Sequence, residues 1–287
     1  ALLGVTGKLF FEAQFDRLVL LFNPFSGNTK EASTLVIGLS EPLISLSPLA
    51  NDTGSRARLN HIYEALVRVS PDLKIEPALA VNFGSLDDLL WEFRLRPGVT
   101  FHNGNPLTFD DVVFSLEAAR DDQDSAVRDL ASSITRIEKT DENIFRIETE
   151  KPDPLFLQKI SYLYIFPRDS KPEDFIGTGP YEYEKQEGKI LTLRRFEKYW
   201  GELPVFPRAQ IIAFASRDEK EEALRRGSVD IVGNVPPDQA RDFQFPYFEL
   251  KALPSVEVNF LMFNFDKTFK NRSLREAVSL ALNTEEL

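Results

Sequence analysis

The sequence predicts an α/β fold that contains mixed and antiparallel strand pairs rather than a regular βαβ series. A β-branched apolar run over Thr34–Leu39 predicts a buried strand. Two later stretches, residues 134–152 and 177–196, alternate apolar and polar side chains around a polar turn, which is typical of β-hairpins. Apolar residues at helical spacing over Arg58–Val69 predict an amphipathic helix that follows the first strand.

The first 33 residues form an N-terminal segment that is apolar in pieces. Four charged side chains between residues 8 and 17 interrupt it, so it contains no apolar run long enough to span a membrane. One interpretation is that residues 1–5 end a removed or truncated anchor and that an amphipathic helix follows over about residues 9–22. The other interpretation is an ordinary packed N-terminal helix.

Turn residues separate the next elements. The Pro- and Ser-rich stretch 41–55 predicts a loop, and residues 71–80 predict a turn-rich connection after the helix of residues 58–69. Residues 89–95 alternate apolar and charged side chains, and the turns RPGV and FHNG follow them, which together predict a β-hairpin or meander.

Two further helices have recognisable ends. Thr108, followed by Asp110 and Asp111, resembles a helix N-terminus, where acidic groups favour the positive end of the helix dipole. Asp111 is therefore predicted to be a cap rather than a catalyst. Residues 218–226 predict a surface helix with Gly227 as its C-cap, and residues 229–232 predict a short strand after it.

Composition limits the classes of function. The 287 residues contain 43% hydrophobic and 28% charged residues, which indicates a globular chain of one large or two ordinary domains. The formal net charge of −11 has the wrong sign for a nucleic-acid-binding protein. The chain has no cysteine, which excludes disulfides, zinc-thiolate sites and thiol nucleophiles, and which fits an exported protein without requiring one.

The sequence contains no recognisable catalytic constellation. His61 and His102 have no partners at metal-ligand spacing, and the sequence has no GxSxG, Walker A or GxGxxG motif. Adjacent acidic residues such as Asp110 and Asp111 are more typical of caps or solvated surfaces than of general acids. We therefore expect no enzyme activity, no metal site and no cofactor.

Five ordered segments nevertheless resemble one family, the family 5 extracellular solute-binding proteins of peptide, nickel and related ABC importers. The resemblance runs from about Thr34 to the end of the chain. The segments are HIYEALVRVSPDLKIEPALA (61–80), WEFRLRPGVTFHNGNPLTFDDVVFSLE (91–117), GTGPYEYE with LRRFEKYWG (177–201), RRGSVDIV (225–232) and LMFNFDKTFKNRSLREAVSLALN (261–283).

The resemblance implies a periplasmic-binding-protein-like type II fold with an inserted smaller α+β domain. It implies that residues 34–53 and 174–255 form lobe I, that residues 54–173 form the inserted domain II, and that residues 256–287 begin lobe III. Most of the second ligand-closing lobe is then absent from this sequence. Whether the sequence is a fragment of a longer protein stays open.

The implied function is that of an extracytoplasmic binding component of an ABC importer, which binds short peptides or a related small solute by hinge closure between two lobes. Its implied partners are the solute and the permease subunits, and we expect a monomer. An anchor to the membrane upstream of Ala1 is an alternative that stays open. The alternative is a non-transporting interaction or signalling protein that keeps the scaffold. The FHNG turn and the GTGPY segment look structural in the family.

The resemblance also implies ligand-binding residues in two segments. In the loop after the first strand, Asp52 is predicted to receive a cationic group, Asn51 and Thr53 to bond ligand amides, and Gly54 to allow close backbone approach. A polar turn that caps the following helix explains the same residues equally well. In the strand that opens lobe III, Met262 and Asn264 lie on one face, which is predicted to line the cleft.

Overall fold

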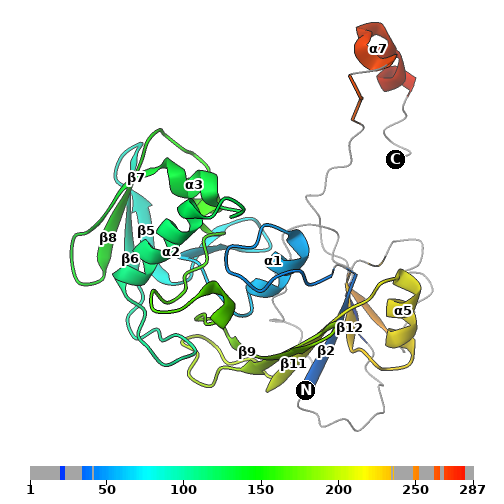
Figure 1. The fold of residues 1–287 in the computed structure, drawn as a ribbon, viewed down its shortest axis with the longest axis horizontal. Helices are drawn as coiled ribbons and strands as arrows, with labels where there is room; N and C mark the ends of the chain where they lie inside the picture. The colour runs from blue at the N-terminus through cyan, green and yellow to red at the C-terminus, as the bar shows by residue number, and fades with distance from the viewer. Residues whose placement is uncertain are drawn as a thin grey trace.

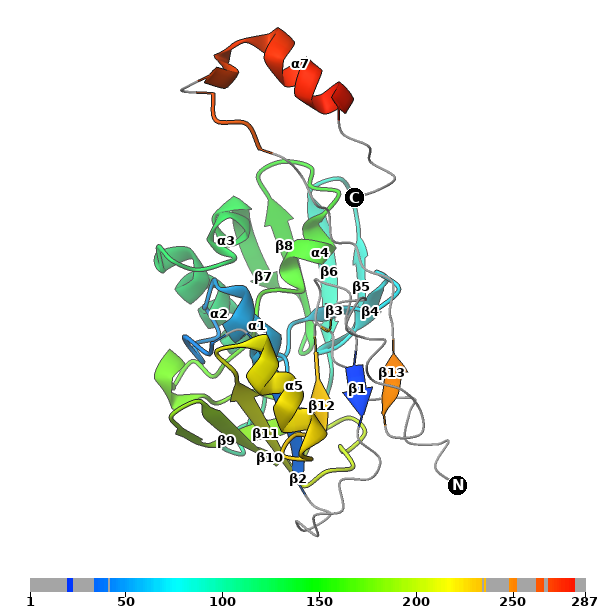
Figure 2. The same cartoon turned by 90° about the vertical axis from the view of Figure 1, so that its right-hand side faces the viewer.

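The computed structural model describes residues 20–22, 34–40, 42–233, 235, 248–251, 262–265 and 268–281. Figure 1 shows two sheets, with helix α1 (Thr53–Leu59) between them, and the turned view in Figure 2 agrees. A continuous apolar core runs through both sheets and includes Leu35, Leu59, Phe93 and Ile147. The two sheets are therefore packed together rather than joined by a loose linker.

The larger sheet has seven strands in the order β13-β1-β12-β2-β11-β10-β9. Strand β2 is parallel to both β11 and β12, whereas β9, β10 and β11 form an antiparallel meander. Helix α5 (Arg217–Arg225) connects β11 to β12. The strands are β1 (Leu20–Phe22), β2 (Thr34–Leu39), β9 (Tyr181–Glu187), β10 (Ile190–Arg195), β11 (Arg208–Ala213), β12 (Ile231–Val232) and β13 (Glu249–Lys251).

The smaller sheet is antiparallel, with the strand order β5-β6-β8-β7, and helices cover its apolar face. Its strands are β5 (Ala80–Ser85), β6 (Leu90–Leu95), β7 (Ile134–Lys139) and β8 (Ile144–Thr149), and its helices are α2 (Phe109–Asp121), α3 (Arg128–Ser133) and α4 (Phe156–Ile160). Beside it, β3 (Val67–Val69) pairs with β4 (Ile75–Pro77). The remaining elements are the short 3-10 helices η1 (Pro172–Asp174) and η2 (Thr268–Lys270) and helix α7 (Arg272–Ala281).

Several predicted elements are confirmed. Strand β2, the hairpins β7–β8 and β9–β10, and the surface helix α5 lie where the sequence pattern placed them. The N-terminus of α2 forms a capping box, in which the Asp111 carboxylate accepts from the Thr108 backbone N–H at 2.8 Å and from its hydroxyl at 2.6 Å. Gly227, with φ of +70°, follows the end of α5 as expected.

Two predicted helices are wrong. The predicted helix of residues 58–69 is instead the end of α1, a turn and strand β3, because the backbone carbonyls of His61 and Ile62 accept from Tyr181 and Gly179. The predicted helix of residues 9–22 is wrong over Leu20–Phe22, which form β1 through backbone pairing with β12 and β13. Residues 9–19 lie outside the described residues.

The hairpin or meander that residues 89–107 predict takes another form. Strand β6 pairs with β5, which precedes it in the chain, and with β8. The turns after β6 contain only an isolated bridge between Thr100 and Pro106. The predicted connection at residues 71–80 contains β4 and the start of β5.

Candidate functional site

Three parallel strands end at one edge of the larger sheet. Strand β2 lies between β11 and β12, and their last residues are Leu39, Ala213 and Val232. In open α/β sheets, ligands bind outside the carboxyl ends of parallel strands. The loop after β2, which contains the predicted residues 51–54, begins at this edge.

A buried lysine ties this edge together. Lys220 lies on α5 and is 1% exposed. Its Nζ donates to the Ser40 hydroxyl at 2.8 Å and to the Gly233 carbonyl at 2.6 Å. Because Ser40 follows β2 and Gly233 follows β12, this one side chain fixes where both connections leave the sheet.

The predicted residues 51–54 form the start of α1. Asp52 is the N-cap, and its Oδ1 accepts from the Ser55 backbone N–H at 2.7 Å. Gly54 is buried, and its carbonyl accepts from the Arg58 side chain. Asn51 is exposed, and Thr53 begins the helix, with its side chain outside the described part. The capping interpretation is thus present in the structure, and ligand binding by these four residues stays a prediction.

Arg56, which the sequence analysis missed, joins this loop to a distant segment. Its Nη1 donates to the Ala50 carbonyl at 3.1 Å and its Nη2 to the Tyr162 carbonyl at 2.7 Å. The guanidinium lies 5.3 Å from the ring centre of Tyr162 and 4.8 Å from that of Tyr164. In the sequence, Arg56 lies between the predicted loop of residues 41–55 and the predicted helix of residues 58–69, so no local signal identifies this contact.

The second predicted group lies in a separate segment. Met262, which is 77% exposed, and the exposed Asn264 belong to residues 262–265, which precede η2 and α7. The structure assigns no strand to these four residues, and the rest of the predicted strand lies outside the described residues. Arg275 of α7 packs over the Phe265 ring at 4.8 Å. That Met262 and Asn264 share one cleft with residues 51–54 stays a prediction.

Glu64 is the centre of a polar junction between the two sheets. Its carboxylate accepts from the Thr178 hydroxyl at 2.9 Å, the Tyr199 hydroxyl at 2.9 Å and the Trp200 indole N–H at 2.8 Å. Burial raises the pKa of Glu64 to about 7, while these three donors and Arg68 act in the opposite direction. The side chain is half-buried by surface area, but both of its oxygens have donors.

The two histidines are structural. His102 Nε2 lies 3.0 Å from the Gly179 carbonyl, and its Nδ1 accepts from the Gly177 N–H at 3.2 Å, so the ring braces this turn as the Nε2–H tautomer. Burial lowers the pKa of His102 to about 4, and burial together with Arg58 lowers that of His61 to about 4. Among the described residues, no cluster of His, Asp or Glu could hold a metal ion.

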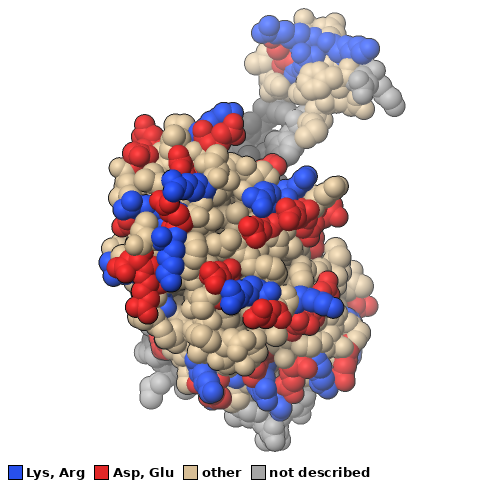
Figure 3. Space-filling model, turned by 60° about the vertical axis from the view of Figure 1, so that its left-hand side comes forward, with Lys and Arg blue, Asp and Glu red and all other residues tan. Residues whose placement is uncertain are grey.

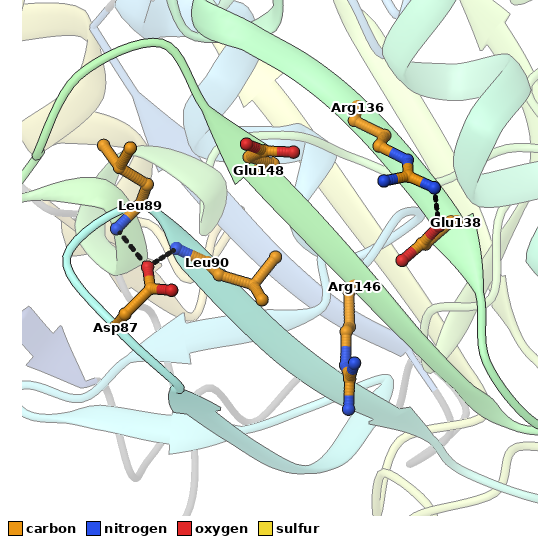
Figure 4. Close-up of a pocket in the computed structure, with 7 residues that line it drawn as sticks. All are labelled: Asp87, Leu89, Leu90, Arg136, Glu138, Arg146 and Glu148. Carbon is orange, nitrogen blue, oxygen red and sulfur yellow. Dashed lines mark hydrogen bonds and ion pairs between the residues drawn. The ribbon is translucent and has the colours of Figure 1, made fainter.

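Two hollows on the outer surface contain none of the predicted ligand-binding residues. Figure 4 shows one on the outer face of the smaller sheet, where Arg136 pairs with Glu138 and the Asp87 carboxylate accepts from two backbone N–H groups. Its volume of about 180 Å³ is below the usual range for ligand pockets. A wider groove of about 570 Å³ runs beside β9–β11, and its arginines are paired with glutamates. Acidic and basic side chains are interspersed on the face in Figure 3.

Comparisons with known proteins agree with this architecture. Residues 74–287 match the family described as bacterial extracellular solute-binding proteins, family 5 Middle. The chain is 25% identical to the glutathione-binding protein GsiB of Pectobacterium atrosepticum, over 89% of this chain and 53% of that protein. It is 22% identical to the oligopeptide-binding protein AppA of Bacillus subtilis, over 91% of this chain and 52% of that protein.

A solved structure gives the same result. The nickel ABC transporter protein from Bacillus halodurans superposes with a TM-score of 0.71 at 28% identity, over 88% of this chain and 54% of that chain. The chain thus spans about half the length of the relatives that it matches.

The fold is that of the α/β solute-binding protein with which the chain superposes. The family match extends over more than half of the sequence. The chain belongs to the family 5 bacterial extracellular solute-binding proteins, which bind solutes and do not transform them. None of the described helices is long and apolar enough to cross a membrane.

Proposed function

We propose that this chain is part of the solute-binding component of an ABC importer, which binds short peptides or a related small solute outside the cytoplasmic membrane. The observation that carries the proposal is the loop after β2, which leaves the carboxyl edge of the parallel strands and is held at both ends. Ser55 anchors its middle by accepting from the Ser45 N–H at 2.9 Å, and Asn51 stays exposed. A fixed loop with an exposed polar group suits ligand recognition.

The proposed binding mode has two halves. Residues 34–53 and 174–255 form lobe I, with residues 54–173 inserted as domain II. Six of the seven strands of the larger sheet come from the two lobe I ranges, which supports this division, and the seventh, β1, comes from the N-terminal segment. Residues 256–287 begin the opposing lobe, from which Met262 and Asn264 contact the solute. Hinge closure then buries the solute between the lobes, and an extended peptide is held through its main-chain amides.

The location and partners follow from this proposal. The protein works as a monomer on the outer side of the cytoplasmic membrane and delivers its solute to permease subunits. Family membership supports an extracytoplasmic location, and the net charge of −11 supports the absence of nucleic-acid partners.

Ligand-dependent stability of the natural gene product tests the proposal. Tri-alanine, glutathione and nickel with histidine serve as probes, since the named relatives bind a glutathione, oligopeptides or nickel. A probe at 100 times its Kd adds about 2.7 kcal/mol of stability, which is visible as a raised Tm. Asn51→Ala is expected to lower this shift, whereas Asn103→Ala, in the exposed turn after β6, is the matched control. No shift with any peptide would contradict peptide binding.

A further inference from the structure

Resting on the proposed function, we infer that Arg56 is a specificity-determining residue that selects solutes with a carboxylate group, which binds between Arg56 and Asn51. The class of ligand is a small solute with a free carboxylate, such as the C-terminus of a peptide or a sugar acid. Both sources share the planar two-oxygen group that matches a guanidinium.

Arg56 is positioned more tightly than an ordinary surface arginine. Its two Nη atoms each donate to a backbone carbonyl, those of Ala50 and Tyr162, and two tyrosine rings flank the guanidinium. These contacts fix the plane of the guanidinium, and the exposed Asn51 directly follows Ala50, whose carbonyl is one of the two acceptors. A pre-positioned charge loses less conformational freedom on binding than a mobile one.

The hydrogen-bonding capacity of Arg56 is only partly used. A guanidinium carries five N–H groups. Among the described residues, backbone carbonyls accept two of them, and the buried Nε has no partner. Two Nη hydrogens therefore have no protein acceptor among the described residues.

The local charge is also incompletely neutralised. No described carboxylate forms an ion pair with Arg56, and the nearest acidic residue in the loop, Asp52, has its Oδ1 engaged in capping α1. An anionic group is therefore attracted to the Arg56 guanidinium over short distances.

Tyr162 forms one wall of the cluster. Its ring lies against Arg56 and its side chain is half-buried. In the proposed site, a carboxylate that accepts from Arg56 has the Asn51 amide as its second donor. The arrangement thus favours a carboxylate over an amide, which would place a second donor against the guanidinium.

Paired probes test the inference on the natural gene product with all the residues that it encodes. Isothermal titration calorimetry compares the affinity for tri-alanine with that for tri-alanine amide, in which an amide replaces the terminal carboxylate. D-Gluconate is the probe for sugar acids. We expect the acid to bind about 10-fold or more tightly than the amide, since charge-assisted hydrogen bonds are the stronger ones. Equal affinity for the acid and the amide would overturn the inference while leaving peptide binding intact.

Variants assign the difference to Arg56. Arg56→Met is expected to abolish the preference for the acid, Arg56→Lys to retain part of it, and Arg136→Met, on the outer face of the smaller sheet, to leave it unchanged. A preference that survives in Arg56→Met overturns the inference, and the probe comparison on unchanged protein decides the matter even if that variant fails to fold. Arg56-dependent binding of D-gluconate without peptide binding would support the inference and refute peptide transport. Binding of no probe would overturn both.

Discussion

Replacement of Glu64 by glutamine should stabilise the protein at alkaline pH and leave it nearly unchanged at acidic pH. Glutamine is isosteric with the protonated carboxyl group. Its carbonyl oxygen can accept from Trp200 and Thr178, and its amide can donate to the Tyr199 hydroxyl, which is free to rotate. The neutral side chain therefore keeps all three partners without placing a charge inside the junction.

The magnitude follows from the pKa of Glu64, which burial raises from the usual 4.5 to about 7. In the folded state the group keeps its proton at higher pH than in the unfolded state, so it lowers stability as pH rises from about 4.5 to 7. A pKa difference of this size corresponds to about 3 kcal/mol. The Glu64→Gln protein should thus gain about 3 kcal/mol over the wild type above pH 7.

Thermal unfolding of both proteins from pH 4.5 to 8.5 measures this effect as a difference. His61 and His102 titrate in the same range with the opposite sign, because their lowered pKa values make stability rise with pH between about 4 and 6.5. Subtracting the wild-type Tm from the variant Tm at each pH cancels the contribution of the histidines, which both proteins share. We expect a Tm difference near zero at pH 4.5 that grows to about 6–12 °C above pH 7. A Glu64→Gln protein that is less stable than the wild type at pH 8 would refute the reasoning.

Three other substitutions test separate features. Gly179→Ala should destabilise the protein by about 3 kcal/mol or more, because its Cβ would lie 2.5 Å from the His61 carbonyl oxygen, whereas Gly84→Ala, with nothing within 4 Å, is the control in the same thermal unfolding assay. His102→Gln should make the free energy of unfolding rise less steeply between about pH 4 and 6.5, since one buried neutral histidine is removed. Urea unfolding at several pH values measures this, and a pH dependence equal to that of the wild type would count against it. Asp52→Ala should cost about 1 kcal/mol through loss of the α1 cap, and Asp52→Ser should restore that stability. If Asp52 also binds a cationic group of the solute, the serine variant separates this role from capping. It should then have wild-type stability but bind lysyl peptides more weakly than the wild type does.

Local patterns predicted those elements whose stability is decided locally. The β9–β10 hairpin contains its own turn, and the Thr108 capping box lies within four consecutive residues, so both can be recognised from sequence alone. Strands β4 and β5 were missed because Pro77, Asn82 and Gly84 have low β-propensity, which pairing with neighbouring strands overrides.

In residues 58–69, by contrast, distant contacts decide the secondary structure. Their apolar side chains are buried as predicted, with Ile62 and Leu66 both fully buried, but helical spacing does not distinguish a helix from a tight turn followed by a strand. The decision comes from Gly179 and Tyr181, more than a hundred positions away, whose N–H groups bond the carbonyls of this turn. Arg56 could not be found for the same reason, since both of its aromatic partners are distant in sequence.

Three of the five segments that carry the family resemblance meet at one place that is separate from the proposed ligand loop. The turn before β3 supplies Glu64, the FHNG turn supplies His102, the GTGP segment supplies Thr178, and the stretch after β10 supplies Tyr199 and Trp200. This junction holds the two sheets together, so its residues specify the fold.

The residues of the loop after β2 that are proposed to touch the solute are under a different requirement. The loop of residues 51–54 and Arg56 lie outside those quoted segments, so these positions can change without disturbing the junction. Relatives with the same fold are named for glutathione, oligopeptides or nickel, as expected when architecture and specificity reside in different residues. Replacing Asn51 and Arg56 by other residues should therefore alter which solute binds, while the pH dependence of stability that Glu64 sets stays unchanged. A shift of that pH dependence would show that the two sets of residues are coupled.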